Sequence, residues 1–414
     1  MPRPSYNIAV IGGGVVGCAV ARELGKRFED VVLIEKEPSA GFHTSGRNSG
    51  VIHSGINPKP GTLKARLCVE GNRELRQYCR DYKIPMEEGG TLVLALRDEE
   101  IPVLEELKSR AGQNGVPGVR LLSPAEIRDH EPHARGIRGL HSPAGAIVDS
   151  LALTRSLAEN ARKEGVEIRL GQEAQEFQET PKGVSFHCGS EVLTAGLLIN
   201  CAGLHADRLA HQMGVGKNYT VAPFRGEYFV VNRPGEPLVK SMIYPAPNLK
   251  FPFLGVHLTK TTTGKILIGP NAVPAFGREA YRASDIRPRD LFEMAGHKGF
   301  WNAFFHNRDL MSVAWNELKN SCSQEHFWRQ ASQLVDGLLP EHISLEAKTG
   351  IRPQLIRSDG ELVEDLVIET TAHSIHILNV ISPGMTSSLA FARWFTAQIN
   401  PALVWTREPA EGAA

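Results

Sequence analysis

A short glycine pattern close to the start of the chain limits the possible folds more than any other feature. An apolar run at residues 8–11 leads directly into Gly12-x-Gly14-x-x-Gly17, and residues 15–25 continue as a helical pattern. Gly12 permits a tight turn, Gly14 lets a pyrophosphate approach the backbone, and Gly17 lets the helix pack closely on the strand. The helix N-terminus then offers free N–H groups to phosphates. The pattern predicts a strand, turn and helix that bind a dinucleotide.

The acidic residue that such a site needs also occurs at the expected distance. A second apolar run, at residues 31–35, ends at Glu35, where a carboxylate would accept hydrogen bonds from the adenosine ribose. A glycine-rich turn without a ligand is the alternative, and the strand, the helix and the acid together argue against it. The motif itself leaves FAD and NAD open.

Length, charge and cysteine content exclude several other classes. A chain of 414 residues predicts two or three domains or one two-lobed unit. Its 46 basic and 46 acidic residues cancel, which argues against a nucleic-acid partner. The six cysteines are scattered and form no C-x-x-C pair, so we expect no metal site and a reducing compartment. A first strand by Ile8 leaves no room for a targeting peptide, and no apolar run could span a bilayer. We therefore expect a soluble protein on the cytoplasmic side, with peripheral contact to the inner membrane left open.

The order of the remaining patterns predicts a discontinuous α/β chain. Residues 41–61 are a polar, glycine-rich loop, 63–82 a helix, 131–145 loop-like, and 226–268 alternate as antiparallel strands. We expect a Rossmann-like FAD-binding domain with an inserted substrate domain made of an antiparallel β-sheet and helices. The expected segments are 1–85, 145–220 and 345–414 for the FAD-binding domain, and 86–144 and 221–344 for the substrate or cap domain.

Two distant turns favour FAD over NAD. An NAD module is normally contiguous, whereas here a second glycine turn follows the strand 197–201, far downstream. The turn at residues 382–388 then opens a C-terminal helix, predicted over 386–399. The N-terminus of that helix could stabilise negative charge on a reduced isoalloxazine, although an ordinary Pro-Gly helix start is the alternative.

With these pieces in place, the chain resembles FAD-dependent oxidoreductases of the D-amino-acid-oxidase type, and within them the L-2-hydroxyglutarate dehydrogenases. The resemblance covers nearly the whole length and rests on these segments: Arg47-Asn-Ser-Gly-Val-Ile-His-Ser-Gly, Pro60-Gly-Thr-Leu-Lys-Ala-Arg-Leu-Cys-Val, Pro223-Phe-Arg-Gly-Glu-Tyr, Phe251-Pro-Phe-Leu-Gly-Val-His, Gly269-Pro-Asn-Ala and Gly350-Ile-Arg-Pro-Gln.

The resemblance implies that L-2-hydroxyglutarate is oxidised to 2-oxoglutarate, with hydride passing from C2 to flavin N5. It also implies that electrons pass to a quinone-type acceptor or slowly to oxygen. Three alternatives stay open: an amino-acid or secondary-amine oxidase on the same fold, a flavin-bearing sensor without turnover, and an NAD-dependent dehydrogenase.

His53 is the expected catalytic base. It lies in the predicted flavin-side loop between two Ser-Gly pairs, and an imidazole is neutral and basic near pH 7. The alternative is that His53 only packs against the flavin, hydrogen-bonds it or tethers it covalently.

A dicarboxylate substrate calls for arginines with further donors around them. Arg225 and Arg352 lead because each lies in a motif that we expect at the junction of the domains. The further candidates for substrate binding are Tyr244, His257, Asn271 and Lys64.

The expected cofactor-binding residues come from the glycine turn, the ribose strand, the loop that follows it and the two distant turns. They are Gly12, Gly14, Gly17, Glu35, Lys36, Thr44, Ser45, Arg47, Asn48, Ser49, Ala202, Gly203, Pro383, Gly384, Met385 and Thr386.

An aromatic stretch within the helical region 285–335 allows two interpretations. Phe300, Trp301, Phe304 and Phe305, followed by Trp315 and Phe327-Trp328, could form a membrane or quinone-docking surface. The mixed charges around them favour packing in a helical core instead.

Overall fold

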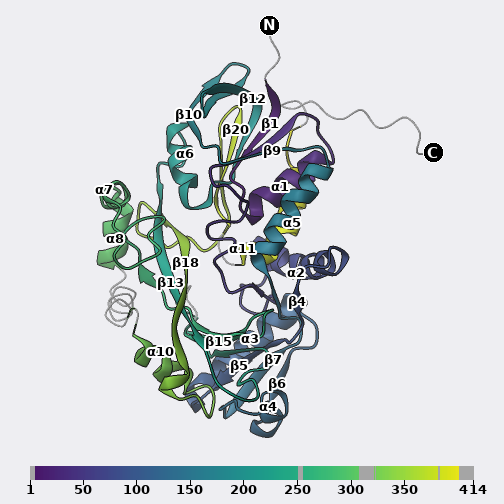
Figure 1. Cartoon of the computed structure of the whole chain (residues 1–414), viewed down its shortest axis with the longest axis vertical. Helices are drawn as coiled ribbons and strands as arrows, with labels where there is room; N and C mark the ends of the chain where they lie inside the picture. Colours follow the sequence, from purple (N-terminus) through teal and green to yellow (C-terminus); the bar gives the residue numbers. More distant parts are fainter. Residues whose placement is uncertain (1–4, 250–254, 307–320, 322, 381–382, 401–414) are drawn as a thin grey trace, which may run out of the picture.

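The computed structural model describes residues 5–249, 255–306, 321, 323–380 and 383–400. The chain forms two lobes, each built on its own large sheet (Figure 1). One lobe holds the N-terminal strand and the C-terminal helix, and the other is dominated by antiparallel strands.

The first sheet has eight strands in the order β10-β11-β12-β1-β2-β9, with β20 beside β12 and β19 beside β20. Strand β1 is parallel to both β2 and β12, and Ile8 is opposite Val31 on one side and Leu197 on the other. Every residue of β1 and β2 is buried, which explains their continuous apolar sequences. The strands are β1 (Tyr6–Ile11), β2 (Val31–Glu35), β9 (Glu167–Leu170), β10 (Ala174–Thr180), β11 (Gly183–Cys188), β12 (Glu191–Asn200), β19 (Val367–Thr370) and β20 (Ser374–Asn379).

Helices from three distant parts of the chain cover this sheet. Helix α1 contacts both α5 and α11, and α11 contacts α2 (Figure 1). Their apolar faces and the sheet form one buried core, so the C-terminal helix is part of the N-terminal lobe. The helices of this lobe are α1 (Val15–Gly25), α2 (Leu63–Asp81), α5 (Ser150–Lys163), α6 (Ala206–Gln212, after the short turn η2, Gly203–His205) and α11 (Gly384–Thr396).

The second sheet has nine strands in the order β17-β13-β16-β15-β14-β5-β7-β6, and β18 pairs with β13. The long strands β13 and β18 run antiparallel and extend from the second lobe towards the first (Figure 1). The strands are β5 (Thr91–Ala95), β6 (Arg120–Leu122), β7 (Arg138–Ser142), β13 (Tyr219–Val231), β14 (Met242–Pro245), β15 (His257–Lys260), β16 (Ile266–Gly269), β17 (Val273–Pro274) and β18 (Ile343–Arg357).

A small third sheet and several helices complete the described chain. The third sheet has the order β3-β8-β4 and consists of β3 (Val51–Ile52), β8 (Ala146–Val148) and β4 (Met86–Glu87). The helices of the second lobe are α3 (Ile101–Gln113, after η1, Asp98–Glu100), α4 (Pro124–His130), α7 (Pro288–Gly296), α8 (Lys298–His306), α10 (Gln324–Ala331) and η3 (Pro340–His342). No helix among the described residues is long and apolar enough to cross a membrane.

The structure confirms the mixed α/β class and corrects some element predictions. The expected loop at 131–145 is wrong in part, because residues 138–142 form β7 in the middle of a sheet. Strand β12 runs unbroken over 191–200, so it begins well before the strand predicted at 197–201. The C-terminal helix begins at Gly384, two residues earlier than expected.

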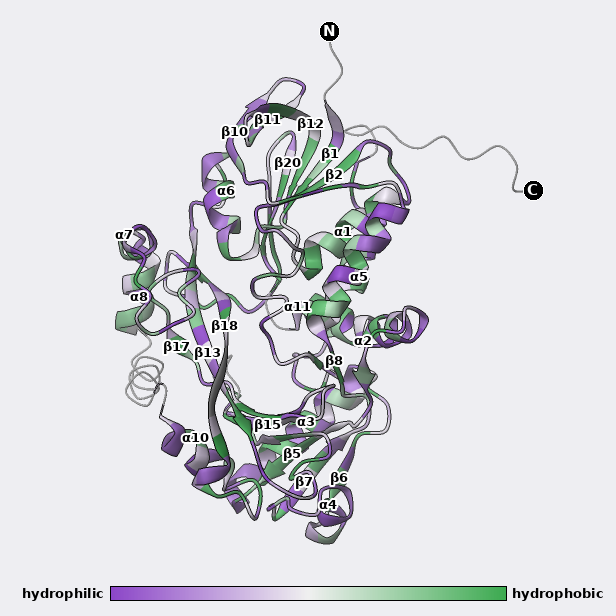
Figure 2. Ribbon diagram, in the orientation of Figure 1, coloured by the Kyte–Doolittle hydropathy of each residue, from purple (hydrophilic) through white to green (hydrophobic). Residues whose placement is uncertain are grey.

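The preference for core packing of the aromatic stretch is wrong for its first half. Phe305 is 63% exposed, and Trp301 and Phe304 are exposed as well, whereas Phe327 is fully buried. Figure 2 shows α8 as a hydrophobic helix on the outside of the molecule. Trp315, Phe251 and the turn residues 381–382 lie outside the described residues.

Candidate active site

Two adjoining cavities lie where the first sheet meets the second lobe. One has a volume of about 360 Å³ and the other about 510 Å³. Both are lined by Gly14, Thr44, Ser45, Cys201 and Gly203, so they form one elongated space that passes the N-terminus of α1. An elongated ligand with a phosphate at its centre fits this arrangement.

The glycine turn makes room at this central point because side chains cannot fit there. Gly12 has a φ of 110°, and a Cβ on it would lie 2.5 Å from the carbonyl oxygen of Cys201. A Cβ on Gly17 would lie 1.9 Å from the oxygen of Gly12. Gly17 therefore permits close packing of α1 on the turn and lines neither cavity.

Glu35 and Ser45 organise the amides around the turn. The Glu35 carboxylate accepts hydrogen bonds from the Gly13 amide (2.5 Å) and the Glu37 amide (2.9 Å). The Ser45 hydroxyl accepts one from the Val15 amide (2.9 Å) at the start of α1. Glu35 also lines the larger cavity, at the position expected for a ribose-binding acid.

Charged side chains from distant segments enclose the larger cavity. Glu279 receives hydrogen bonds from Lys36 and from the imidazole of His205, both of which line this cavity. His205 and Lys36 together hold the pKa of the Glu279 carboxyl far below its usual value. Glu279 therefore stays ionised and ties the second lobe to the cofactor side of the first.

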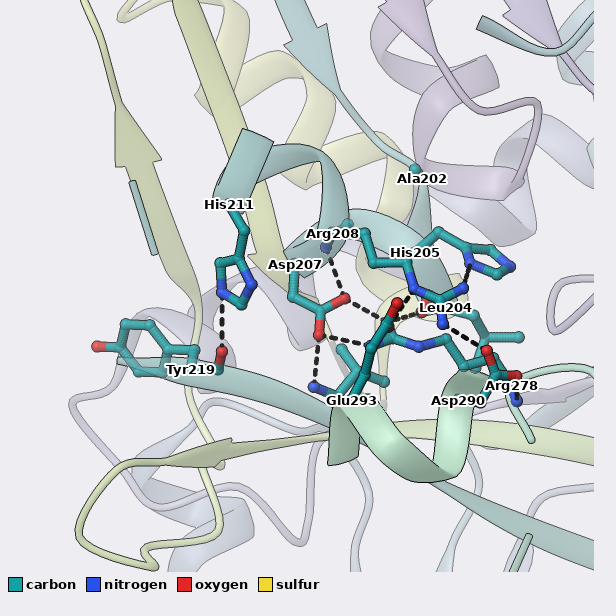
Figure 3. Close-up of polar contacts among 12 residues, drawn as sticks. Ala202, Leu204, His205, Asp207, Arg208, His211, Tyr219, Arg278, Asp290 and Glu293 are labelled. Atoms are coloured by element: carbon teal, nitrogen blue, oxygen red, sulfur yellow. Dashed lines mark hydrogen bonds and ion pairs between the residues drawn. The ribbon is translucent and has the colours of Figure 1, made fainter. Parts of the chain in front are cut away.

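A second ionic network, drawn in Figure 3, fixes α6 beside the same cavity. Arg278 donates to both oxygens of Asp207, which also accepts from the Val221 amide (2.8 Å). Arg208, which lines the cavity, is paired with Asp290 and Glu293 of α7. The network connects α6, β13 and α7, so the wall of the cavity is shared between the lobes.

His53 lines the smaller cavity with its backbone held on both sides. Its amide donates to the Thr386 hydroxyl (3.0 Å), and its carbonyl accepts from the Asn72 side chain (3.1 Å). Burial, and then the charges of Lys64 and Arg352, lower the pKa of His53 to about 4. The imidazole is therefore neutral at physiological pH, as a general base must be.

His257 lines the same cavity and stacks on Tyr244. The ring centroids are 4.1 Å apart, and Nδ1 of His257 donates to the Gly255 carbonyl (2.9 Å), which assigns Nε2 as its acceptor nitrogen. Burial, together with the nearby His53, lowers the pKa of His257 to about 4 despite that hydrogen bond. The cavity thus holds two neutral imidazoles.

Arg352 supplies positive charge close to His53. It lines the smaller cavity, and burial lowers its guanidinium pKa to about 10, so it remains protonated at neutral pH. Lys64 lies near both residues electrostatically, but its ammonium donates to the Glu364 carbonyl (2.9 Å) and it does not line the cavity.

Arg225 also lines the smaller cavity, yet its charge is already paired. It is 2% exposed and lies 3.0 Å from the carboxylate of Glu227, which is 4% exposed. Asn271 engages the same residue through both ends of its amide: Nδ2 donates to Glu227 (2.9 Å) and Oδ1 accepts from the Glu227 amide (2.8 Å). Glu227 therefore holds two of the predicted substrate residues.

The structure brings most of the predicted site residues to these two cavities. The smaller cavity is lined by His53, Arg225, Arg352, Tyr244, His257, Asn271, Gly14, Thr44, Ser45, Arg47, Asn48, Ser49, Gly203, Pro383, Gly384, Met385 and Thr386. The larger is lined by Gly12, Glu35, Lys36 and Ala202, besides the shared residues. Gly17 and Lys64 line neither.

Sequence reasoning missed several residues of this site. Tyr228 lines the smaller cavity, and burial raises its pKa to about 12. Tyr228 and Glu227 lie inside the quoted segment that begins at Pro223, so attention to all of that motif could have found them. His205 and Arg208 follow the second glycine turn. The sequence did not show the direction of the short helix α6, and so did not show that these two side chains face the cavity.

Comparison with known proteins agrees with this geometry. Residues 7–398 match the family of FAD dependent oxidoreductases designated DAO. The chain is 37% identical to a protein from Indibacter alkaliphilus named L-2-hydroxyglutarate dehydrogenase, over 93% of this chain and 96% of that one. It is 36% identical to the mitochondrial L-2-hydroxyglutarate dehydrogenase of Nematostella vectensis, over 95% of this chain and 90% of that one.

A solved structure extends the match to three dimensions. Dithionite-reduced L-alpha-glycerophosphate oxidase from Mycoplasma pneumoniae, with FAD bound, superposes with a TM-score of 0.75 at 25% identity, covering 94% of this chain and 92% of that one.

The fold and the site thus define a flavin-dependent oxidoreductase. The chain belongs to the DAO family of FAD-dependent oxidoreductases, and its cofactor is FAD. The residues present fit this group, because the turn at Gly12, where a Cβ would collide with the backbone, and the elongated double cavity leave space for a dinucleotide along the start of α1.

Proposed function

We propose that this flavoenzyme oxidises L-2-hydroxyglutarate to 2-oxoglutarate. The observation that carries the proposal is the lining of the smaller cavity. Among the residues that the structure describes, three arginines line it (Arg47, Arg225 and Arg352), of which Arg225 is paired with Glu227 behind the lining, and no aspartate or glutamate lines it. This lining suits an anionic substrate, and the relatives named above supply the particular hydroxy acid.

The side chains divide the reaction between them. His53, neutral at physiological pH, takes the proton of the substrate hydroxyl. Arg352 holds a carboxylate and so orients C2, and the apolar wall around Tyr244 and His257 limits water. FAD, when bound, supplies the acceptor for the hydride that leaves C2. An amino-acid or secondary-amine oxidase fits less well, because an ammonium group would face the arginines.

The cofactor-binding roles predicted from the sequence are part of the proposal. Glu35 and Lys36 would bind the adenosine ribose. The central phosphates and the flavin edge would lie against Thr44, Ser45, Arg47, Asn48, Ser49, Ala202 and Gly203. Pro383 is the N-cap of α11 and residues 384–386 begin its first turn, whose N–H groups would stabilise negative charge on a reduced flavin.

We also propose that the electrons pass to a quinone-type acceptor at a membrane surface. Support comes from α7 and α8, where Phe292 is 78% exposed and Trp301, Phe304 and Phe305 are exposed beside it. Within residues 282–305 the exposed charged residues are basic: Arg282, Arg287, Arg289 and Lys298. The acids nearby are paired: Asp290 and Glu293 with Arg208, Glu293 also with Arg289, and the exposed Asp359 and Glu361 with Arg357. Aromatic and basic side chains together suit an anionic lipid surface.

The division into two domains at the boundaries given above is likewise a proposal. Its support is that all eight strands of the first sheet come from the segments 1–85, 145–220 and 345–414. Strand β18 begins at residue 343 and pairs with β13 of the other sheet, so it connects the two units.

Product analysis tests the proposed reaction. The holoenzyme, incubated without oxygen with L-2-hydroxyglutarate and a soluble quinone, should form 2-oxoglutarate and quinol in equal amounts. Quinone reduction by glycine or sarcosine, with none by the hydroxy acid, would assign the chain to the amine oxidases instead.

A further inference from the structure

A buried carboxylate beside the smaller cavity has no place in the reaction described so far. Glu227 lies on β13, two residues after Arg225, and accepts hydrogen bonds at both of its oxygens. Arg225 Nε (3.1 Å) and Ser321 Oγ (2.7 Å) donate to Oε1, while Asn271 Nδ2 (2.9 Å) and Ser321 Oγ (2.9 Å) approach Oε2. An ionised carboxylate so well satisfied holds its partners in one geometry.

The pairing of Glu227 with Arg225 changes the charge that a substrate meets in the smaller cavity. Arg225 and Glu227 are both almost fully buried and lie 3.0 Å apart, so their charges cancel seen from the cavity. Among the described residues, Arg225 Nη1 has no hydrogen-bond partner. The guanidinium can therefore still donate a hydrogen bond to a ligand, although its charge is neutralised by Glu227. Arg352, whose charge contributes to the lowered pKa of His53, remains protonated at neutral pH and supplies the cation at the reacting end.

We propose that Glu227 is a specificity-determining and positioning residue of this site. It fixes Arg225 and Asn271 as a rigid wall without net charge, so a dicarboxylate is held by the guanidinium of Arg352 at one end and by neutral contacts at the other. The inference rests on the proposed function, since it concerns how that substrate is recognised.

Two inhibitors that differ in one carboxylate test the idea. Glutarate and pentanoate have the same chain length, and binding of each to the oxidised holoenzyme is followed through the change in the flavin spectrum, without turnover. The Glu227→Gln variant keeps the shape and loses the charge. Because Arg225 then carries an uncompensated charge, the preference for glutarate over pentanoate should rise on the order of tenfold or more.

Two further variants separate charge from structure. Glu227→Asp keeps the charge and should keep the preference near that of the native protein. Ser321→Ala removes a hydrogen bond from Glu227 without changing any charge and should also leave the preference unchanged. Equal preferences in Glu227→Gln and the native protein would overturn the proposal, and so would a rise of the same size in Ser321→Ala.

Failure of the proposed function gives a different result. If the native holoenzyme shows no preference for glutarate over pentanoate, the dicarboxylate assignment itself fails. If Glu227→Gln does not fold with its flavin, Glu227→Asp decides alone: a preference that collapses despite the retained charge contradicts the electrostatic account.

Discussion

The backbone amide of His53 donates a hydrogen bond to the side-chain hydroxyl of Thr386, over 3.0 Å. The two residues are 333 positions apart, one in the loop after the ribose strand and the other in the first turn of α11. The bond joins the expected base to the helix end expected at the flavin. The bond fixes the backbone from which the His53 side chain enters the smaller cavity.

Replacing His53 by alanine should remove the base and leave the cofactor site intact. We expect bound flavin in normal amount and a reduction rate that is 10²–10⁴-fold lower, the usual range for a lost general base. Anaerobic stopped-flow absorbance with L-2-hydroxyglutarate measures this rate. His187→Ala, in an exposed position on β11, is the matched control and should reduce at the native rate. An unchanged rate in His53→Ala would remove this residue from the chemistry.

Arg352→Lys should be costly although the charge is kept. A lysine cannot reproduce the planar, two-pronged contact that a guanidinium makes with a carboxylate. We expect KM for the hydroxy acid to rise roughly 10–100-fold, the equivalent of one or two charge-assisted hydrogen bonds. Steady-state kinetics with a fixed acceptor measures it. A native KM would show that Arg352 makes no such contact.

Gly17→Ala should destabilise the first lobe. Its Cβ would lie 1.9 Å from the backbone oxygen of Gly12, so α1 would have to move away from the turn. We expect a cost of about 1–3 kcal/mol or more and weaker retention of FAD. Gly112→Ala is the control, because nothing lies within 4 Å of its Cβ near the end of α3, and it should stabilise by about 0.5–1 kcal/mol. Thermal unfolding of both variants distinguishes them, and equal melting temperatures would refute the account of the turn.

Buried histidines should make the fold acid-sensitive. Burial lowers the pKa of His257 and of His376 to about 4, well below the value of about 6.5 expected in an unfolded chain. The unfolded state therefore binds more protons than the folded state below pH 6.5. Stability should be full above that pH and fall progressively as the pH drops from 6.5 towards 4. Denaturant unfolding at a series of pH values checks this, and His376→Asn should flatten the decline. A stability that is constant over this window would contradict the prediction.

Local patterns predicted the cofactor side of the molecule well. The turn at Gly12, the acid at Glu35 and the helix at the C-terminus each follow from short-range spacing, and all lie together in the structure. Short-range patterns could not reveal the ion pair between Arg225 and Glu227. Residues two apart on a strand point to the same face, so Arg225 and Glu227 could have been expected to be neighbours. That Glu227 is held against Arg225 depends on its hydrogen bonds with Asn271 and Ser321, which are distant in sequence.

The outer helices were misjudged for a related physical reason. Mixed charges in the region 285–335 argued for core packing, but the acids at 290 and 293 pair with Arg208, Glu293 also with Arg289, and the aromatic residues of α8 are left exposed. Charge counting along a sequence cannot separate the inward from the outward side chains of a helix before its partner is known.

Anaerobic reduction of the bound flavin tests the central claim most directly. The purified holoenzyme is mixed in separate cuvettes with L-2-hydroxyglutarate, its D-enantiomer, glycine and sarcosine, and the visible absorbance is followed. We predict bleaching by the L-hydroxy acid alone. Bleaching by an amine, with the hydroxy acid inert, would contradict the assignment of the arginine-lined cavity to a dicarboxylate.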